Sequence, residues 1–185
     1  ENCIQNTTIR YDKTGDQHYQ TISAYIKSLR ASDTNASLYW LARMLYSGED
    51  PIFIARRIVI FASEDVGVAD SNALLIAISA MKSVQLIGMP ESQYILSHAT
   101  IYLSKAPKNN SAKTSINAAL KEVKSSGNQP VPLHLRNAVT NLEKSMDYGK
   151  NYIYPHDEKN FINKISNFPE NLINTIFFTE ENSND

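Results

Sequence analysis

The chain has 185 residues and a mass of 20.8 kDa, enough for one domain with at most a fragment of a second. Hydrophobic residues make up 42% of it and the formal net charge is −1, so it can build a core and has no overall field that attracts nucleic acid. Cys3 is the only cysteine, which excludes an internal disulfide framework and favours a cytoplasmic protein. No apolar run in these 185 residues approaches the length of a membrane span, and no signal-peptide pattern is found.

Helical periodicity dominates the first third of the chain. Tyr19, Ile22, Ile26 and Leu29 form one apolar stripe and predict a helix over 16–30. A second helix is expected to begin after Asp33 and to end at Gly48. A third is expected over 51–65, because Asp50 suits an N-cap and Pro51 suits the first helical position.

The remaining helices are delimited in the same way. Asp70 is expected to cap a helix over 71–87 that is apolar nearly all round and is therefore predicted to be central. Further helices are predicted over 90–106, 111–127 and 135–146. About seven helices without a strand signal predict an all-α bundle. The first ~15 residues suggest a chain crossing between units, and a polar, disordered tail is expected at the other end.

Charge is uneven along the chain. Residues 104–150 hold eight Lys and Arg against three Asp and Glu, whereas residues 156–185 hold two against six. A basic middle beside an acidic tail suggests an anionic partner, or self-assembly by charge complementarity.

No enzyme signature is found. A phosphate-binding loop would need glycine at Lys144 and a hydroxyl at Asn151 to match Gly149-Lys150. No two histidines have the i, i+4 spacing of a metal site on a helix, and no G-x-S-x-G nucleophile motif occurs. No catalytic, cofactor-binding or metal-binding residue is therefore assigned.

Two charged sets allow a structural and a functional interpretation. Arg56 and Arg57 precede Glu64 and Asp65 on one predicted helix, either as a solvated face or as pairs across a subunit interface. The lysines of "LSKAPKNNSAK" either solvate a loop or meet phosphates of DNA. They are Lys105, Lys108 and Lys113.

Several motifs in a fixed order resemble one family. They are "YDKTGDQHYQTISAYIKSLRASD" (11–33), "IARRIVIFASEDVGVAD" (54–70), "IYLSKAPKNN" (101–110), "PVPLHLRNAVT" (130–140) and "DYGKNYIYPHD" (147–157). Together they resemble the replication-associated recombination protein A ATPases and the Werner-helicase-interacting AAA+ ATPases, which are related to clamp loaders. The resemblance covers roughly residues 11–172.

The resemblance implies a C-terminal fragment without its ATPase motor. Residues 1–47 would be the end of the helical lid with its linker, and residues 48–185 a helical tetramerisation domain like a clamp-loader collar. ATP and magnesium would belong to the missing motor. DNA replication, recombination and repair at stalled forks are implied, with single-stranded or forked DNA and single-strand DNA-binding protein as partners, in a cytoplasmic, nucleoid-associated protein.

The family pattern coincides with Arg56, Arg57, Glu64, Asp65, Pro107, Lys108, His134, Leu135, Arg136, Asn137, Tyr154, His156 and Asp157. All of these except Pro107 and Leu135, together with Lys105 and Lys113, are candidates for contact with DNA or an interface. Val139 stands where the family usually has proline, so a helix is expected to run straight from Arg136 to Met146.

We therefore expect a non-catalytic oligomerisation and partner-binding domain. Its basic stretch from Lys105 to Lys150 would face DNA or the acidic tail of a partner. Two alternatives stay open. One is an enzyme with His134, His156 and Asp157 as an acid–base cluster, and the other is a monomeric helical adaptor with a peptide groove.

Overall fold

Two helical units make up the described part of the chain in a computed structural model, which describes residues 16–157 and 165–179. The first unit extends to Thr114 and the second covers Ser115–Thr179. The described ranges contain α-helices, 3-10 turns and one π-helical turn but no β-strand, which confirms the all-α fold class. None of these helices is long and apolar enough to span a membrane. The expectations for residues 1–15 and for the last six residues lie outside the described ranges.

The α-helices of the described ranges are α1 (Asp16–Arg30), α2 (Thr34–Tyr46), α3 (Pro51–Phe61), α4 (Asn72–Ile87), α5 (Ser92–Lys105), α6 (Ser111–Ser126) and α7 (Asn141–Ser145).

The predicted start signals of α2 and α3 are confirmed. The Asp33 carboxylate accepts a hydrogen bond of 2.9 Å from the backbone N–H of Ala36. The Asp50 carboxylate accepts one of 2.9 Å from Ile52, and Pro51 occupies the first turn of α3. Each aspartate satisfies a backbone donor that has no partner within its helix.

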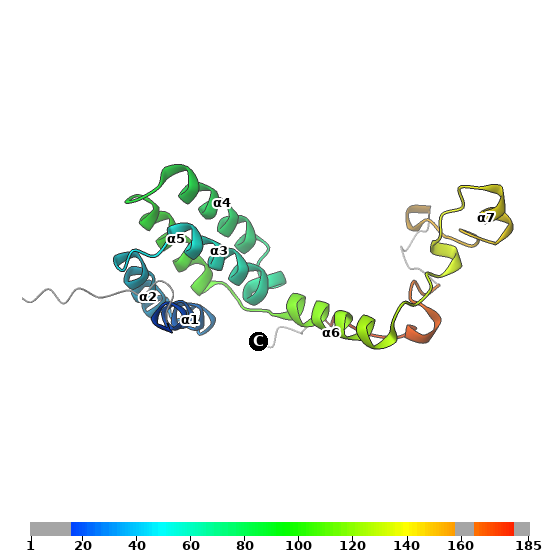
Figure 1. The fold of residues 1–185 in the computed structure, drawn as a ribbon, viewed down its shortest axis with the longest axis horizontal. Coiled ribbons are helices and arrows are strands. Elements are labelled where there is room, and N and C mark those ends of the chain that lie inside the picture. The colour runs from blue at the N-terminus through cyan, green and yellow to red at the C-terminus, as the bar shows by residue number, and fades with distance from the viewer. Residues whose placement is uncertain (1–15, 158–164, 180–185) are drawn as a thin grey trace, which may run out of the picture. The chain divides into compact units, whose positions relative to one another are not determined.

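Helix α5 lies at the centre of the first unit, where it contacts α1, α2, α3 and α4 (Figure 1). Its Leu96 and Leu103 are fully buried. The hydroxyls of Tyr25 on α1 and Thr100 on α5 share a hydrogen bond of 2.7 Å inside the core. Burial raises the pKa of the Tyr25 phenol far above its usual range.

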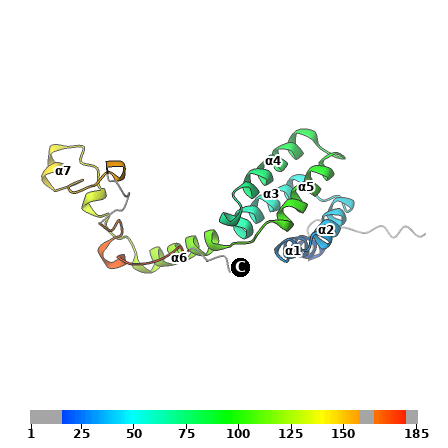
Figure 2. The same ribbon diagram turned by 180° about the vertical axis from the view of Figure 1, so that it is seen from behind.

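The prediction that the helix over 71–87 is central is wrong. Helix α4 packs beside α3 and α5 and covers one side of the unit, as Figure 2 shows from behind. Its buried face consists of small residues, namely Ala73, Ala77, Ala80 and Val84. Small side chains allow close helix packing on that face, and four of the larger apolar residues of α4 point outward. Leu74, Leu75, Leu86 and Ile87 are all exposed.

A π-helical turn, Ala62–Val66, follows α3 directly. Gly67 comes next with φ +53°, and a Cβ atom built on it would lie 2.6 Å from the backbone oxygen of Asn109. The backbone N–H of Asn109 in turn donates to the backbone oxygen of Asp65 at 2.8 Å. The π-turn therefore holds the loop between α5 and α6 in close backbone contact, and only glycine fits at position 67.

The second unit has few helical residues beyond α6. The predicted helix from Arg136 to Met146 is wrong, because α7 begins only at Asn141. Thr140 is extended (φ −101°, ψ 160°), and its hydroxyl accepts from the N–H of Glu143, whose carboxylate accepts from the N–H of Thr140. This capping box starts the helix there, and Arg136 is held in extended backbone.

Candidate functional site

The candidate site lies in the second unit, at the corner that the sequence "PVPLHLR" forms. Leu133–Leu135 make one 3-10 turn, and the backbone N–H of Gly149 donates to the oxygen of Leu133 at 2.9 Å. Gly149 has φ +71°, and a Cβ there would lie 3.3 Å from the backbone oxygen of Arg136. The two chain segments of the corner are thus joined by backbone contacts. The amide of Gly149 is engaged in this tie, so Gly149-Lys150 does not form a phosphate cradle.

Arg136 holds the corner together. Its Nε donates to the backbone oxygen of Val131 at 2.7 Å, and a terminal nitrogen donates to the Tyr148 hydroxyl at 3.2 Å. The guanidinium carbon also lies 5.0 Å from the centre of the Tyr148 ring, a cation–π distance. Arg136 is therefore a positioning residue of the corner, in addition to any contact with a partner.

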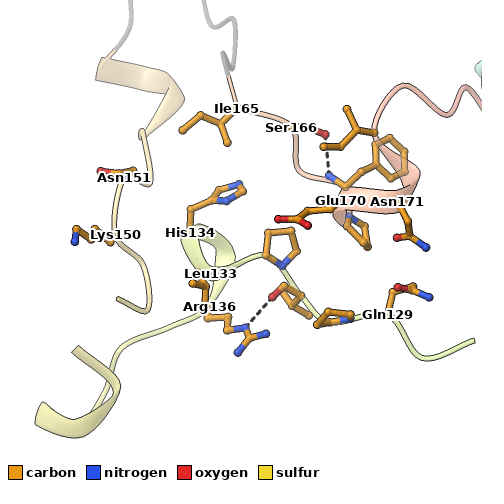
Figure 3. Close-up of a pocket in the computed structure, with 16 residues that line it drawn as sticks. Gln129, Leu133, His134, Arg136, Lys150, Asn151, Ile165, Ser166, Glu170 and Asn171 are labelled. Carbon is orange, nitrogen blue, oxygen red and sulfur yellow. Dashed lines mark hydrogen bonds between the residues drawn. The ribbon is translucent and has the colours of Figure 1, made fainter. Parts of the chain in front are cut away.

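A pocket of about 770 Å³ opens at this corner (Figure 3). Its apolar wall consists of Pro130, Val131, Pro132, Leu133, Ile165, Phe168, Pro169 and Ile173. Its polar lining includes His134, Arg136, Lys150 and Glu170. Figure 3 shows Lys150 and Asn151 on the side opposite Glu170 and Asn171, with His134 between them. An apolar hollow with a few charged groups at its rim can accept an extended peptide or an aromatic group.

The two proline-flanked histidines make different contacts. His134 lines the pocket, and its Nε2 lies 3.3 Å from the amide oxygen of Asn167. The ring of His156 lies 5.0 Å from the exposed ring of Tyr154. Asp157 ends the 3-10 turn that begins at Pro155. Among the described residues, no group of three His, Cys, Asp or Glu side chains is placed to hold a metal ion.

A second charged cluster lies in the first unit, on the π-turn. Arg30 Nε donates to the Asp65 carboxylate at 2.6 Å, and Lys113 donates to the Glu64 carboxylate. The hydrogen bond with Asp65 raises the pKa of Arg30, and the hydrogen bond with Lys113 lowers the pKa of Glu64. The π-turn thus joins the end of α1 to the start of α6.

Arg30 is not among the residues predicted from the sequence, where Glu64 and Asp65 are paired only with the arginines of the same helix, Arg56 and Arg57. Arg56 is exposed, and the Nε of Arg57 is buried with no hydrogen-bond partner among the described residues. Arg57 still acts on Glu64 electrostatically, as one of the smaller influences on its pKa. A basic residue in the last turn of α1, directly before a turn, was the available signal for Arg30.

The three loop lysines have different environments. Lys105 is exposed. Lys108 Nζ donates to the backbone oxygens of Ser104 (3.1 Å) and Ala106 (2.5 Å) and to the Ser32 hydroxyl (3.1 Å), and its partial burial lowers its pKa. Lys113 is paired with Glu64. Asn137, in the other unit, is exposed. A contact of any of these residues with DNA stays a prediction.

Comparison with known proteins adds the family. A family model described as "MgsA AAA+ ATPase C terminal" matches residues 31–185, and one described as "AAA C-terminal domain" matches residues 1–30. The predicted boundary after Ser47 stays a prediction.

Curated relatives agree with these matches. Replication-associated recombination protein A of Coxiella burnetii is 47% identical over 91% of this chain and 39% of its own length. The protein of the same name from Escherichia coli K12 is 45% identical over 82% of this chain and 34% of its own length. ATPase WRNIP1 of Dictyostelium discoideum is 42% identical over 95% of this chain and 20% of its own length. The chain therefore spans less than half the length of these relatives. The resemblance seen in the motifs is confirmed: the chain belongs to the family of MgsA-type AAA+ ATPases and corresponds to their C-terminal helical region.

Proposed function

We propose that this region is the oligomerisation domain of an AAA+ ATPase that acts in DNA replication, recombination and repair at stalled forks. The observation that carries the proposal is the apolar face of α6. Ile116, Leu120 and Val123 follow one another at helical spacing and are 57%, 50% and 62% exposed. A continuous exposed stripe of this kind is typical of a helix that packs against a partner.

A homotetramer is the assembly that the family resemblance favours. It would hold the nucleotide sites of four motors in a fixed array, with ATP and magnesium bound by the motors. This chain would contribute contacts and no catalytic group.

Assembly is tested by the solution mass, measured by light scattering coupled to size exclusion over a range of concentrations. A tetramer of this chain has about four times its mass of 20.8 kDa, roughly 83 kDa. Leu120→Glu should dissociate it, because a buried unpaired carboxylate is costly. Ala118→Glu is the matched control, since it places the same charge on an exposed position on the opposite side of the same helix. If the chain is monomeric at every concentration, or if both variants behave alike, the proposal fails.

The pocket at the corner supports a second role in binding partners. Arg136, Lys150 and His134 line a largely apolar hollow whose only acidic side chain among the described residues is that of Glu170. This composition suits an acidic peptide with an apolar anchor, such as a tail of single-strand DNA-binding protein. It equally supports the peptide-binding adaptor considered from the sequence, should the chain prove monomeric. The acid–base enzyme has less support, because the described contacts of His134 and His156 join them to different residues.

DNA binding would use the exposed lysines. Lys108 and Lys113 contribute to internal contacts, so neutralising them would also disturb the fold. Lys121 and Lys124 are exposed and are better probes. We expect binding to single-stranded or forked DNA to weaken with salt, and each neutralised phosphate contact to reduce the logarithmic slope by roughly 0.7 to 0.9. Fluorescence anisotropy with labelled DNA measures the DNA binding, and the same assay with a labelled acidic peptide measures binding at the pocket. Salt-independent binding would refute the DNA role.

A further inference from the structure

An exposed ridge runs along the outer side of α5. It consists of Glu91, Tyr94, His98, Ile101 and Lys105, which follow one another at spacings of three and four and therefore lie on one face. Tyr94 is 70% exposed although its neighbours on α5 form the core of the unit. We refer to these five residues as the α5 ridge.

The α5 ridge has a hollow on each side. The hollow between α2 and α5 has a volume of about 610 Å³ and is lined mainly by leucines and by Tyr46 of α2. The hollow between α4 and α5 has a volume of about 490 Å³ and is lined by Leu75, Ile76 and small residues of α4. Tyr94 borders both hollows. The ridge and the two hollows beside it therefore form one exposed surface with apolar side chains that a partner helix can cover.

The charges of the α5 ridge are arranged symmetrically about its middle. Glu91 lies seven residues before His98, and Lys105 lies seven residues after it. At a rise of about 1.5 Å per residue, the acidic and basic ends are roughly 21 Å apart. An antiparallel copy of the same ridge would place an acid opposite each base, whereas a parallel copy would place like charges together.

We propose that the α5 ridge is a two-fold interface with a second copy of this chain, in which two antiparallel α5 helices meet at His98. Each Glu91 would then face Lys105 of the other copy, and each Tyr94 would lie beside the other Ile101. A two-fold interface uses the same surface on both subunits, so that surface must complement itself. The proposal rests on the assembly function above and specifies one of its contact surfaces.

The observations favour a second copy over an unrelated partner. An unrelated helix requires no charge symmetry about the midpoint of α5, whereas a copy of α5 does. The exposed face of α6 lies on another element, and a tetramer of dihedral symmetry needs two distinct interfaces of this kind. The same two charges also stabilise α5 by itself, because an acid at the start and a base at the end of a helix suit its dipole. A change in stability would therefore not identify an interface, so the experiments below measure association.

Disulfide cross-linking tests the position of the axis. Cys3→Ser removes the only cysteine of the sequence, and His98→Cys then adds one at the proposed axis. A disulfide forms only when two Cα atoms come within about 7 Å. Under mild oxidation His98→Cys should yield a covalent dimer, twice the chain mass of 20.8 kDa. The control is Lys105→Cys in the same background, because residue 105 of each copy would lie roughly 21 Å from the other along an antiparallel pair. Cross-linking of Lys105→Cys without that of His98→Cys would overturn the proposal.

Charge reversal gives an independent readout. Glu91→Lys and Lys105→Glu should each raise the dissociation constant roughly ten-fold, since two exposed ion pairs are replaced by repulsion. The double variant should return it to within about three-fold of the original. The α5 interface is refuted if the chain assembles but the double variant does not regain the original dissociation constant, or if His98→Cys does not cross-link. The assembly function would still stand in that case. A chain that stays monomeric would refute both.

Discussion

Replacing Gly67 with alanine should strongly destabilise the first unit. Gly67 has φ +53° and ψ −129°, a conformation that other residues adopt at a cost of about 1–3 kcal/mol. The added Cβ would also lie 2.6 Å from the backbone oxygen of Asn109, so the loop between α5 and α6 must move. That movement disturbs the 2.8 Å hydrogen bond from Asn109 to Asp65, worth about 1 kcal/mol. We expect the free energy of unfolding to fall by about 2–4 kcal/mol.

Urea denaturation followed by far-UV circular dichroism measures this loss. With a slope of about 2 kcal/mol per molar urea, the midpoint should fall by roughly 1–2 M. Gly48→Ala is the control, because Gly48 also has positive φ (+78°) but an added Cβ would meet no atom within 4 Å. It should cost only about 1 kcal/mol. If the two variants lose the same stability, the close contact with Asn109 carries no energy and the reasoning about the π-turn is refuted.

Three further predictions concern named side-chain contacts. The hydrogen bond with Lys113 lowers the pKa of Glu64, so this contact stabilises the fold at neutral pH and the stabilisation is lost as the pH falls through the folded-state pKa. Glu64→Gln should reduce the acid dependence of the urea midpoint, and an unchanged dependence would contradict the argument. Tyr25→Phe should cost about 1–2 kcal/mol because it leaves the buried Thr100 hydroxyl unpaired, and adding Thr100→Val should recover part of that loss in denaturation experiments. Thr140→Ala should cost about 1 kcal/mol by removing the capping box, and amide exchange in the first turn of α7 should quicken; unchanged exchange would contradict the role of the cap.

Local signals predicted the helices well where a cap and a breaker delimit them. Asp33, Asp50 and Pro51 act on the backbone within one turn, so their effect can be inferred without tertiary contacts. The short α7 shows the limit of such reasoning. The absence of proline at Val139 permits a longer helix, but the capping box of Thr140 and the hydrogen bonds of Arg136 favour extended backbone.

Packing and long-range pairing were less predictable. The apolar composition of α4 indicates burial, yet its alanines take the buried face and its leucines point outward. Which face is buried depends on the shape of the neighbouring helices, which no local pattern contains. The pairing of Arg30 with Asp65 spans 35 residues and depends on the π-turn, whose backbone no motif of the sequence indicated.

The π-turn also has a consequence for how this region tolerates changes of chain length. A π-turn contains about one residue more than an α-helical turn. Loss of a single residue there, such as Ser63, would let α3 continue as an ordinary helix. Side chains after the deletion would then be turned by roughly 100° about the helix axis from their present direction, while those before it would stay in place. Glu64 and Asp65 could no longer face Arg30 and Lys113 together. We therefore expect a deletion between α3 and α4 to be poorly tolerated, even where a substitution at the same position is accepted.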